Sequence, residues 1–381
     1  MANEILIRNG RMLDPARSID SQCDIFMRDG KVAPLESMSS GSVRELNADG
    51  CLVVPGLIDF HAHLGRNLSD TGANPDLASI PNGITASVDA GSTGAAAAAA
   101  FVMDVVARSE ITIKAFLHVS AVGVMTDQYV ENPDPAKFDA TAIAETLARY
   151  SDVFIGLKLR LGKGYSDGYG LSSFRRAKEI AVATGKPLYV HATNPEFPLA
   201  DLVSEMDRGD YLCHCYQGFG KHTILTSNGD IDNAILRARE RGVLFDAAVG
   251  RVNHQYSIIR QAFAHGFTPD IISTDLVAAS LYDPRLFCLL RVMSMFLAVG
   301  MPLLEVVRCC TEVPARLMGF DCMRGTLAPG AIADVAILKL IEKPVAFTDR
   351  TGDALSVPQL LVPKATIVGG KILYEQIDFE Y

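Results

Sequence analysis

The pattern of hydrophobic and polar residues changes twice along the chain. Residues 5–10 and 24–32 are short apolar runs that meet Asn-Gly and Asp-Gly pairs, which are typical of β-hairpin turns. A similar strand, turn and strand pattern returns only in residues 334–338 and 365–374. We therefore expect the two ends of the chain to pair into one small sheet domain, with the residues between them inserted as a unit.

Between the two ends, short apolar runs alternate with amphipathic stretches. Strands are expected at residues 53–60, 84–89, 111–118, 153–158, 187–191, 211–214, 243–247 and 270–275. Helices are expected at residues 95–108, 142–150, 172–184, 231–241 and 256–265. Eight such repeats predict an α/β fold in which a (β/α)8 TIM-type barrel carries a small β-sandwich domain built from both chain ends.

The predicted domains follow from this alternation. Residues 1–54 form the N-terminal part of the small β domain, residues 55–320 the barrel, and residues 321–381 the C-terminal part of the small domain. Long loops rich in Gly, Pro and Asp follow the C-terminal ends of three predicted strands, at residues 123–138, 161–173 and 216–230. Barrel enzymes build their sites at this end, so these loops are candidate pocket walls, with at least one expected to be a plain surface excursion.

The first predicted barrel strand ends in two histidines. Residues 53–63 read VVPGLIDFHAH, which places His61 and His63 one residue apart. Alternate residues of a strand point to the same side, so both imidazoles can reach one metal ion. Many His-x-His pairs lie on solvated strands, but this pair ends an apolar run, which favours a buried site.

Four later strands also end in residues that can bind metals. Lys158 lies in the fourth strand, His191 and His214 end the fifth and sixth, and Asp275 ends the eighth. Each has an ordinary explanation alone, such as a core histidine, a lysine that reaches the barrel rim, or a helix cap. Because all of them lie at the same end of a parallel barrel, the set predicts a metal centre. Its ligands are His61, His63, Lys158, His191, His214 and Asp275.

Composition narrows the class of protein. The 381 residues are 49% hydrophobic and 21% charged, and the net charge of -9 lacks the clustered basic residues of a nucleic-acid partner. The sequence shows neither a secretory signal nor an apolar stretch long enough to cross a membrane. The eight cysteines form no disulfide or zinc-ribbon pattern. We expect a cytoplasmic protein with a small-molecule substrate, without nucleic-acid or membrane partners, that forms a homo-oligomer through the helices around Leu286–Leu297.

Residues 54–63 resemble the entry signature of the amidohydrolase superfamily of metal-dependent hydrolases. The Lys, His, His and Asp of the later strands occur in the order found in that superfamily. Residues 311–319 resemble its post-barrel helix, and residues 325–334 resemble its return into the small sheet domain. The resemblance covers essentially the whole chain. It is strongest for the dihydroorotase-like branch, and residues 266–275 are similar to the deacetylase group.

The resemblance implies two divalent metal ions. Zn²⁺ is the expected metal for a site rich in imidazole with added oxygen ligands, and manganese, iron or nickel are the alternatives. It also implies that Lys158 is carboxylated by CO₂. A buried cationic lysine beside two metal ions is electrostatically disfavoured, whereas a neutral amine can form a carbamate that bridges both ions. In this assignment one metal is bound by His61, His63 and Asp275 and the other by His191 and His214.

The expected activity is hydrolysis of an amide or ester bond. The substrate would be a small carboxylate-bearing compound that is deacylated, such as an N-acyl amino acid or an acylated hydroxy acid. Asp275 is the expected catalytic residue, because it can take a proton from the attacking water and return it to the leaving group.

Three other functions are considered. The alternative is a cyclic amide hydrolase of the dihydroorotase or hydantoinase type. A nucleobase deaminase is less favoured, because deaminases of this superfamily usually use one metal and lack the lysine in strand four. Some relatives of the hydantoinases have lost metal ligands and serve as assembly or signalling proteins, but this chain keeps every ligand position.

Residues that recognise the substrate are harder to assign. Dihydroorotases have an arginine close after the His-x-His motif. Here Arg66 is displaced from that position by one residue, which argues against a dihydroorotase activity. Arg160 points the same way along its strand as Lys158. A carboxylate can be held by arginine or by a single hydrogen bond. The candidates are Arg66, Arg160, Arg251 and His254, with Asn253 beside them.

The neighbours of the ligand positions are assigned other roles. His118, which ends the third strand, is a weaker pocket candidate, and Asp89 is expected to be structural. Cys213 and Cys215 flank His214, so they are expected to alternate away from the site and to pack elsewhere.

Overall fold

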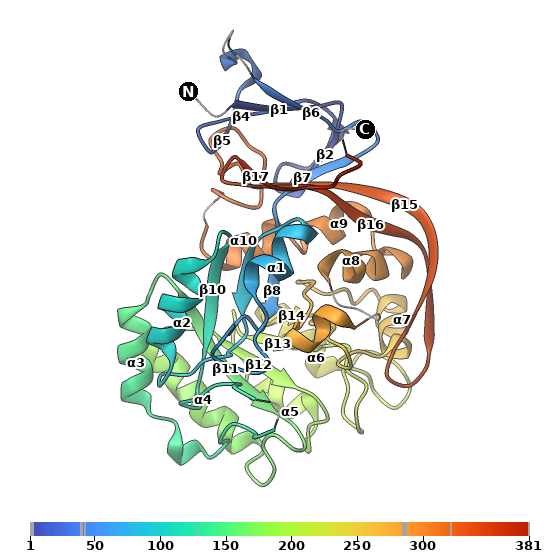
Figure 1. Cartoon of the computed structure of the whole chain (residues 1–381). Helices are drawn as coiled ribbons and strands as arrows, with labels where there is room; N and C mark the ends of the chain where they lie inside the picture. The colour runs from blue at the N-terminus through green and yellow to red at the C-terminus, as the bar shows by residue number, and fades with distance from the viewer. Residues whose placement is uncertain are drawn as a thin grey trace.

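The computed structural model describes residues 4–38, 41, 43–126, 128–283, 288–320 and 322–379. The chain forms a barrel with a small all-β domain at one end, as predicted (Figure 1). Within the described ranges, no helix is long and apolar enough to cross a lipid bilayer.

The small domain is a sandwich of two sheets that share an apolar core, which includes Ile7, Met27, Val53 and Ile367. The first sheet, in spatial order, contains β5 (Lys31–Ala33), β4 (Ile25–Arg28), β1 (Glu4–Arg8) and β6 (Arg44–Asn47). The second contains β17 (Lys371–Glu375), β16 (Ala354–Val368), β15 (Val335–Thr348), β7 (Leu52–Pro55), β2 (Arg11–Asp14) and β3 (Ile19–Gln22). The two ends of the chain therefore meet in the second sheet, where β7 pairs with β15.

Two predicted hairpin turns behave differently. Asp29 and Gly30 have φ values of 52° and 77° and form the tight turn between β4 and β5, as predicted. The prediction at Asn9-Gly10 was wrong, because β1 and β2 belong to different sheets. At Gly10 a Cβ would lie 2.4 Å from Val53 Cγ2, so glycine permits β7 to approach this crossover closely.

The chain passes from the small domain into the barrel at Gly56. The predicted strand at residues 53–60 is divided there into β7 and β8 (Leu57–Ala62), which belong to different sheets. A Cβ on Gly56 would lie 2.2 Å from Thr85 Oγ1. Only glycine fits this passage without displacing the next barrel strand.

The barrel wall is a parallel sheet in which neighbouring strands follow one another in the sequence. Its strands are β8, β9 (Ile84–Asp89), β10 (Thr112–His118), β11 (Phe154–Leu161), β12 (Leu188–Ala192), β13 (Tyr211–Cys213) and β14 (Leu244–Asp246). Each overlaps a strand expected from the hydrophobic pattern. The barrel centre is filled with apolar and aromatic side chains such as Phe60, Phe116 and Tyr189, so the barrel is a packed core with its site at one end.

Residues 270–276 close the barrel as an extended segment rather than as a regular strand. Isolated bridges join Ile271 to β14 and Leu276 to β8. The carboxylate of Asp59 in β8 accepts hydrogen bonds from the backbone N–H of Thr274 at 3.0 Å and from its hydroxyl at 2.5 Å. The ladder is interrupted at Asp275, whose φ of 52° lies in the left-handed region.

Helices cover the outside of the barrel (Figure 1). They are α1 (Pro75–Ser79), α2 (Ala98–Asp104), α3 (Ala140–Arg149), α4 (Leu171–Thr184), α5 (Leu199–Ser204), α6 (Asn233–Arg241), α7 (Tyr256–Ala264), α8 (Leu289–Ala298), α9 (Leu303–Arg308) and α10 (Glu312–Leu317). Turns of 3₁₀ helix lie at Pro15–Arg17, Leu35–Ser37, Ile80–Asn82, Val106–Arg108, Pro135–Lys137 and Ala278–Tyr282. The helix predicted at residues 95–108 is thus divided into α2 and a 3₁₀ turn.

The helix proposed as an oligomer interface is covered by its own chain. Leu286 lies outside the described residues, but α8 lies against β16, and Ser294 Oγ accepts a hydrogen bond from the backbone N–H of Leu361 at 2.9 Å. Met293 and Phe296 are fully buried. The apolar pattern of α8 is therefore accounted for within one chain, and a homo-oligomer stays a prediction.

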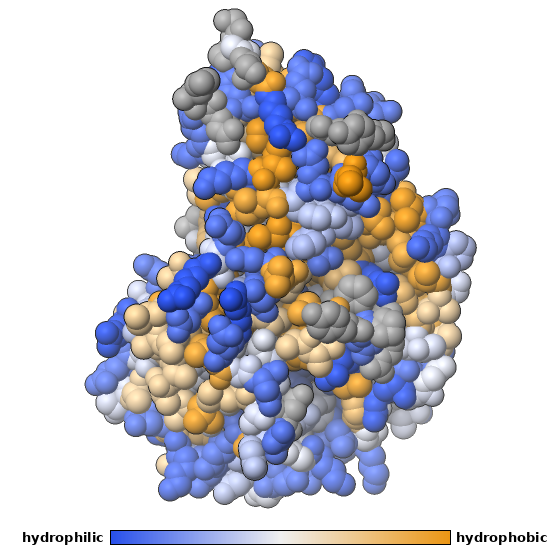
Figure 2. Space-filling view, in the orientation of Figure 1, coloured by the Kyte–Doolittle hydropathy of each residue, from blue (hydrophilic) through white to orange (hydrophobic). Residues whose placement is uncertain are grey.

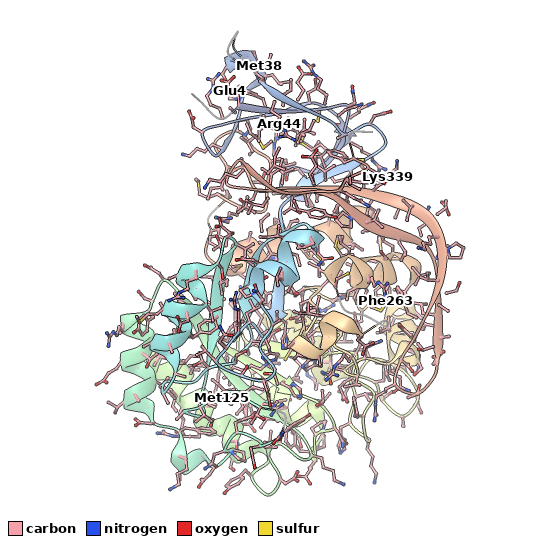
Figure 3. All side chains as sticks on the ribbon, in the orientation of Figure 1. Glu4, Met38, Arg44, Met125, Phe263 and Lys339 are labelled. Atoms are coloured by element: carbon pink, nitrogen blue, oxygen red, sulfur yellow. The ribbon has the colours of Figure 1, made fainter. Side chains whose placement is uncertain are left out.

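A long hairpin formed by β15 and β16 was not predicted. It extends from the small domain along the side of the barrel (Figure 1), with Lys339 near its root and Phe263 of α7 beside it (Figure 3). Its tip contacts the barrel, because Asp349 accepts a hydrogen bond from the backbone N–H of Tyr256 at 2.9 Å, where α7 begins. Residues 339–364 contain prolines and charged residues that interrupt the alternation of apolar and polar positions, so the hydrophobic pattern did not indicate these strands.

Surface polarity differs between the two ends of the molecule. On the face shown in Figure 2, hydrophobic residues gather where the small domain meets the barrel, whereas the far end of the barrel is mostly hydrophilic. Met125, in the loop that follows β10, lies toward that far end (Figure 3).

The contact at the hairpin tip leads to a stability prediction. Asp349 is buried and also accepts hydrogen bonds from Thr351 and Asp353, so Asp349→Ala leaves several donors without an acceptor. We expect a loss of about 1–3 kcal/mol, measured as a lower midpoint of thermal unfolding.

The matched control for this prediction is Arg260→Ala. It removes an exposed ion pair with Asp353 at the same tip, which is worth about 0–1 kcal/mol. Equal midpoints for Asp349→Ala and the unchanged protein would contradict the prediction.

Candidate active site

The structure brings the six predicted metal ligands together at the C-terminal end of the barrel. They are His61 on β8, His63 after it, Lys158 on β11, His191 on β12, His214 after β13, and Asp275 in the closing segment. His61, Lys158 and His214 are each 1% exposed. Parallel strands end on the same side of a barrel, which is why residues so far apart in sequence meet here.

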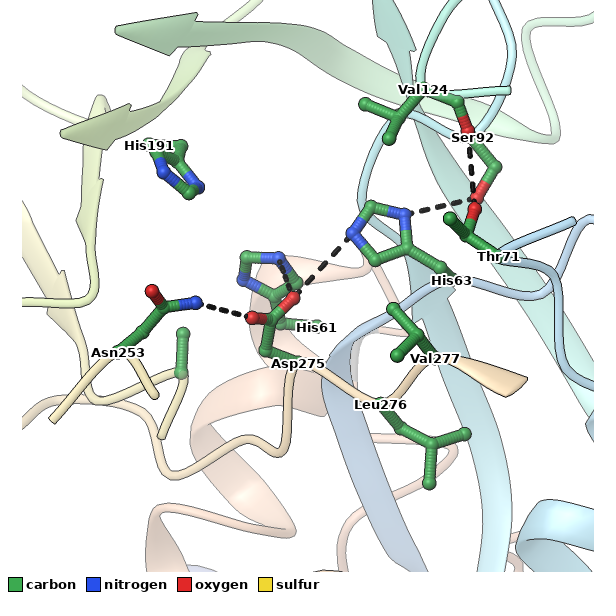
Figure 4. Close-up of polar contacts among 12 residues, drawn as sticks. His61, His63, Thr71, Ser92, Val124, His191, Asn253, Asp275, Leu276 and Val277 are labelled. Atoms are coloured by element: carbon green, nitrogen blue, oxygen red, sulfur yellow. Dashed lines mark hydrogen bonds and ion pairs between the residues drawn. The ribbon is translucent and has the colours of Figure 1, made fainter. Parts of the chain in front are cut away.

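Asp275 lies between the rings of His61 and His63 (Figure 4). Its Oδ1 atom is 3.3 Å from His61 Nε2 and 3.5 Å from His63 Nε2. One ligand atom from each of the three lies within 4.8 Å of the other two. The ring centroids of His191 and His214 are 4.3 Å apart, and those of His61 and His214 are 5.1 Å apart. The rings form one continuous cluster.

Two ligand positions have left-handed backbones. His214 has a φ of 58° and Asp275 a φ of 52°. Such conformations are uncommon for residues other than glycine and cluster at functional sites. At His214 the turn breaks strand alternation, so Cys213 also faces the barrel interior, with its Sγ atom 3.6 Å from Lys158 Nζ. The expectation that Cys213 points away was wrong, whereas Cys215 does pack outside, in the core beneath the helices.

Hydrogen bonds determine which nitrogen two of the histidines present to the site. The hydroxyl of Tyr189 donates to Asp246 Oδ2, so its oxygen accepts the Nδ1–H of His61 at 2.8 Å. His214 donates its Nδ1–H to the carbonyl of Ala248 at 2.7 Å. The Nε2 atoms of His61 and His214 are both buried. Among the described residues that of His214 has no hydrogen-bond partner, and that of His61 faces Asp275 Oδ1 at 3.3 Å.

The other two histidines are held by hydroxyl groups. His63 Nδ1 is 3.1 Å from Ser92 Oγ, which leaves its Nε2 toward Asp275 (Figure 4). His191 is bonded through Nε2 to Thr193 Oγ1 at 2.7 Å, so its Nδ1 is the atom left for a ligand. Partners of this kind fix the ring orientation of metal-binding histidines.

Burial favours the neutral form of three of these imidazoles. It lowers the pKa of His61 and of His191 well below the ordinary value, and lowers that of His214 to about 4. For Asp275, burial acts to raise the pKa, but the close contacts with the imidazoles of His61 and His63 bring it well below the ordinary value. Neutral imidazoles beside a carboxylate are the form that binds metal cations.

Lys158 is buried, and its amine contacts an aromatic ring and a thiol. Its Nζ atom lies 4.6 Å from the centroid of the Tyr189 ring and 3.6 Å from Cys213 Sγ. In the described part of the chain, no carboxylate lies within ion-pair distance of this amine. A Cβ on Gly91 would lie 2.6 Å from Lys158 Cγ, so glycine provides the room for this side chain. The donor set and the unpartnered nitrogens fit a pair of divalent cations.

A cavity of about 130 Å³ opens above this cluster and is lined by four of the predicted ligands, His63, Lys158, His191 and Asp275. Two of the three loops predicted as walls contribute to it, through Val124 and Tyr165. The loop at residues 216–230 contributes none of the lining residues, in agreement with the expectation that one loop is a surface excursion.

The four predicted substrate-binding residues separate into two groups. Arg160 and Arg251 line the cavity, together with Asn253. Arg66 is exposed and lines a different surface pocket with Asp76 and Asp104. His254 is buried, and its Nδ1 donates to the carbonyl of Val249 at 3.0 Å. The structure therefore does not bring Arg66 or His254 to the cavity.

Asp89 and His118 take up positions beside the ligands. Asp89 accepts hydrogen bonds from the backbone N–H groups of Leu64 at 2.7 Å and Ser92 at 2.7 Å. It thereby holds the turns that carry His63 and its partner, as expected for a structural residue. His118 is buried, with Nε2 3.5 Å from Glu131 Oε1.

Sequence reasoning missed the carboxylate network behind the ligands. Asp246 ends β14 and accepts hydrogen bonds from Tyr189, Ser273 and the backbone of Ala248. Burial raises the pKa of Asp246 to about 6. The sequence does contain a pattern that indicates this network. Tyr189 lies two residues before His191 on the same strand face, and Asp246 ends an apolar strand.

Comparison with known proteins agrees with this geometry. The family model described as "Amidohydrolase family" matches residues 52–373. The chain belongs to the amidohydrolase family. This amidohydrolase is accordingly a hydrolase that acts on carbon–nitrogen bonds, and the family generally uses a binuclear metal site with a carboxylated lysine.

Relatives of this amidohydrolase carry different names. A deacetylase of Agrobacterium fabrum is 29% identical, over 93% of this chain and 87% of that protein. A solved dihydroorotase superimposes with a TM-score of 0.89 and 27% identity, covering 98% of each chain. A solved adenine deaminase superimposes with a TM-score of 0.88 and 25% identity, covering 98% of this chain and 99% of the other. The fold thus serves several reactions, and the substrate must be argued from the site.

The hydrogen bond between Tyr189 and His61 leads to a prediction about metal binding. Tyr189→Phe removes the hydroxyl that orients this imidazole and removes the hydrogen bond that this hydroxyl donates to Asp246 Oδ2. We expect the affinity for Zn²⁺ to fall by about 10–100-fold, measured by competition with a chromophoric chelator.

Tyr211→Phe is the control for this change. Its ring lies 5.3 Å from that of Tyr189 in the same aromatic cluster, and the described contacts of His61 do not include its hydroxyl. Unchanged Zn²⁺ affinity in Tyr189→Phe would show that this bond does not support the ligand.

Proposed function

We propose that this amidohydrolase is a binuclear metal-dependent enzyme that removes the acyl group from a small carboxylate-bearing amide, such as an N-acyl amino acid. The observation that carries the proposal is the cluster of Asp275 with His61 and His63, in which Oδ1 lies 3.3 Å and 3.5 Å from the two Nε2 atoms. The similarity to a deacetylase supports the proposal that an acyl group is removed. The arginines that line the cavity support the proposal that the substrate carries a carboxylate.

His61, His63 and Asp275 would hold one cation, and His191 and His214 the other. Lys158, carboxylated by CO₂, would bridge them, since its buried amine has no acidic partner in the described chain. Zn²⁺ suits this set of imidazole and oxygen donors. Two cations in such a site supply Lewis acidity for the substrate carbonyl and a water that is deprotonated near neutral pH.

Asp275 is placed to move the proton in this reaction. Its Oδ2 atom accepts a hydrogen bond from Asn253 Nδ2 at 2.7 Å, which fixes the plane of the carboxylate (Figure 4). Asp275 would accept the proton of the attacking water and return it to the leaving nitrogen. An ester of a hydroxy acid can be cleaved by the same steps, with oxygen as the leaving atom.

A cyclic amide hydrolase is the second candidate. It is favoured by the similarity to the solved dihydroorotase over nearly the whole chain. A screen of N-acyl amino acids, acylated hydroxy acids, dihydroorotate and hydantoins with the Zn²⁺-loaded protein separates the candidates. Fastest turnover of a ring amide would favour this second function over deacylation.

Metal removal tests the cofactor proposal. We expect chelator-treated protein to lose activity and to recover fully only with Zn²⁺ and bicarbonate together, because the carbamate needs CO₂. Lys158→Met keeps the length of the side chain but removes the amine, so it should fail to hold two metals per chain. Metal analysis and native mass spectrometry measure both effects, with Lys163→Met, at an exposed position, as the control. An unmodified lysine in a fully metal-loaded protein would refute the bridging role.

Asp275→Asn tests the proton transfer. The amide keeps an oxygen near the cations but is far less basic, so we expect kcat to fall by about 10²–10⁴-fold while most of the metal stays bound. Asp270→Asn makes the same change five residues earlier, where the carboxylate accepts the N–H of Phe245, and should keep kcat within a few-fold. Activity retained in Asp275→Asn would overturn the assignment.

A further inference from the structure

The two arginines of the cavity have different electrostatic surroundings. Both Arg160 and Arg251 line the space above the predicted metal ligands. A cation whose charge is already balanced by an acid of the protein attracts a substrate anion less strongly than one whose charge is unbalanced. The ion pairs of the two side chains therefore indicate which of them is available.

Arg160 is already paired with an acid. Its Nε atom donates to Glu131 Oε1 at 2.6 Å, and Nη2 donates to Oε2 of the same carboxylate. Its guanidinium also lies 4.1 Å from the centroid of the Tyr165 ring. Glu131 is 5% exposed, and although burial acts to raise its pKa, His118 and Arg160 hold that pKa well below the ordinary value. The charge of Arg160 is thus balanced by the loop that follows β10.

Among the residues that the structure describes, Arg251 has no such partner. It follows Gly250 in the turn between β14 and α7, and its side chain is half-buried at the cavity. Within the described ranges, no acidic side chain lies within ion-pair distance of Arg251. The carboxylate of Asp275 is bonded to Asn253 and lies against His61 and His63, so its hydrogen-bonding capacity is largely used.

The same turn also contacts the proposed catalytic carboxylate. Gly250 has a φ of 55°, and a Cβ at this position would lie 2.7 Å from Asp275 Oδ2. Asn253, three residues on, donates to that oxygen. An anion bound by Arg251 would therefore be held on a segment that is itself fixed against Asp275. The carboxylate and the scissile amide of the substrate are then constrained to lie close together.

We propose that Arg251 binds the carboxylate of the substrate, and that Arg160 instead anchors the β10–α3 loop through Glu131. This inference rests on the proposed deacylase function and narrows it. The substrate class is an N-acyl α-amino acid, in which the carboxylate is one carbon from the amide nitrogen. Arg251 is thus the specificity-determining residue, and Arg160 is a positioning residue.

The test compares charged and neutral substrates. The probes are N-acetyl α-amino acids of both configurations, their primary amides, and the longer N-acetyl-β-alanine and N-acetyl-γ-aminobutyrate. With Zn²⁺-loaded Arg251→Gln, we expect kcat/KM for the best α-acid to fall by about 10–100-fold, mostly through KM, because a charged hydrogen bond is lost. The neutral amides should change by less than about 3-fold, because they lack the anion that Arg251 binds.

Three further variants complete the design. Arg251→Lys keeps the charge but not the bidentate geometry, so it should recover part of the lost affinity. Arg66→Gln makes the same change at an exposed arginine that lines a separate pocket and should leave kcat/KM unaltered. Arg160→Gln leaves buried Glu131 without its bidentate partner, so it should lower the midpoint of thermal unfolding.

The outcomes are distinguishable. Selective loss for the acids in Arg251→Gln, together with a preference for α-acids over the longer acids, supports the inference. If Arg251→Gln still prefers acids to amides, or if the unchanged enzyme cleaves both equally, Arg251 is not the carboxylate receptor, and the deacylase function stands. If no N-acyl compound is cleaved by fully metal-loaded enzyme, the proposed function itself fails and this inference fails with it.

Discussion

The burial of a lysine without an acid is the constraint on which the site depends. Lys158 is 1% exposed, and its amine lies 3.6 Å from the thiol of Cys213. A charged ammonium in such a place is costly unless it is paired or chemically changed. Burial lowers the pKa of the neighbouring His61 and His191, so neutral imidazoles surround this amine. This end of the barrel therefore matches the binuclear metal site with a carboxylated lysine that the amidohydrolase family generally uses.

Hydrogen bonds behind the ligands prepare them for those cations. Tyr189 links His61 to Asp246, and Ser92 and a backbone carbonyl hold His63 and His214. Each of these three rings is left with its Nε2 atom toward the site. Such partners restrict ring rotation before any ligand arrives, which reduces the ordering that metal binding would otherwise require. The barrel thus contributes a pre-arranged donor set rather than single ligands.

The two arginines of the cavity have different roles, one in holding a loop and one in the proposed binding of substrate. Glu131 balances Arg160 and attaches a loop to the barrel, whereas Arg251 faces the cavity from a turn that also touches Asp275. The hairpin of β15 and β16 adds a second restraint, because Asp349 binds the backbone at Tyr256, five residues after Arg251. The small domain thereby reaches the segment that carries the proposed specificity residue.

Much of this could be predicted from the sequence, because the periodic burial of parallel strands is a local property. The apolar runs that end in His61, Lys158, His191 and Asp275 indicated both the barrel and its six candidate ligands. Contacts between distant segments decided the rest. The Asn9-Gly10 pair connects two different sheets instead of forming a hairpin turn. Cys213 faces the barrel interior because His214 has a left-handed backbone, and Arg160 forms an ion pair with Glu131. The sequence pattern indicates which side of its own helix or strand a residue lies on. Ion pairs across the barrel depend on distances between segments that are far apart in the sequence, and these distances are determined only by the tertiary structure.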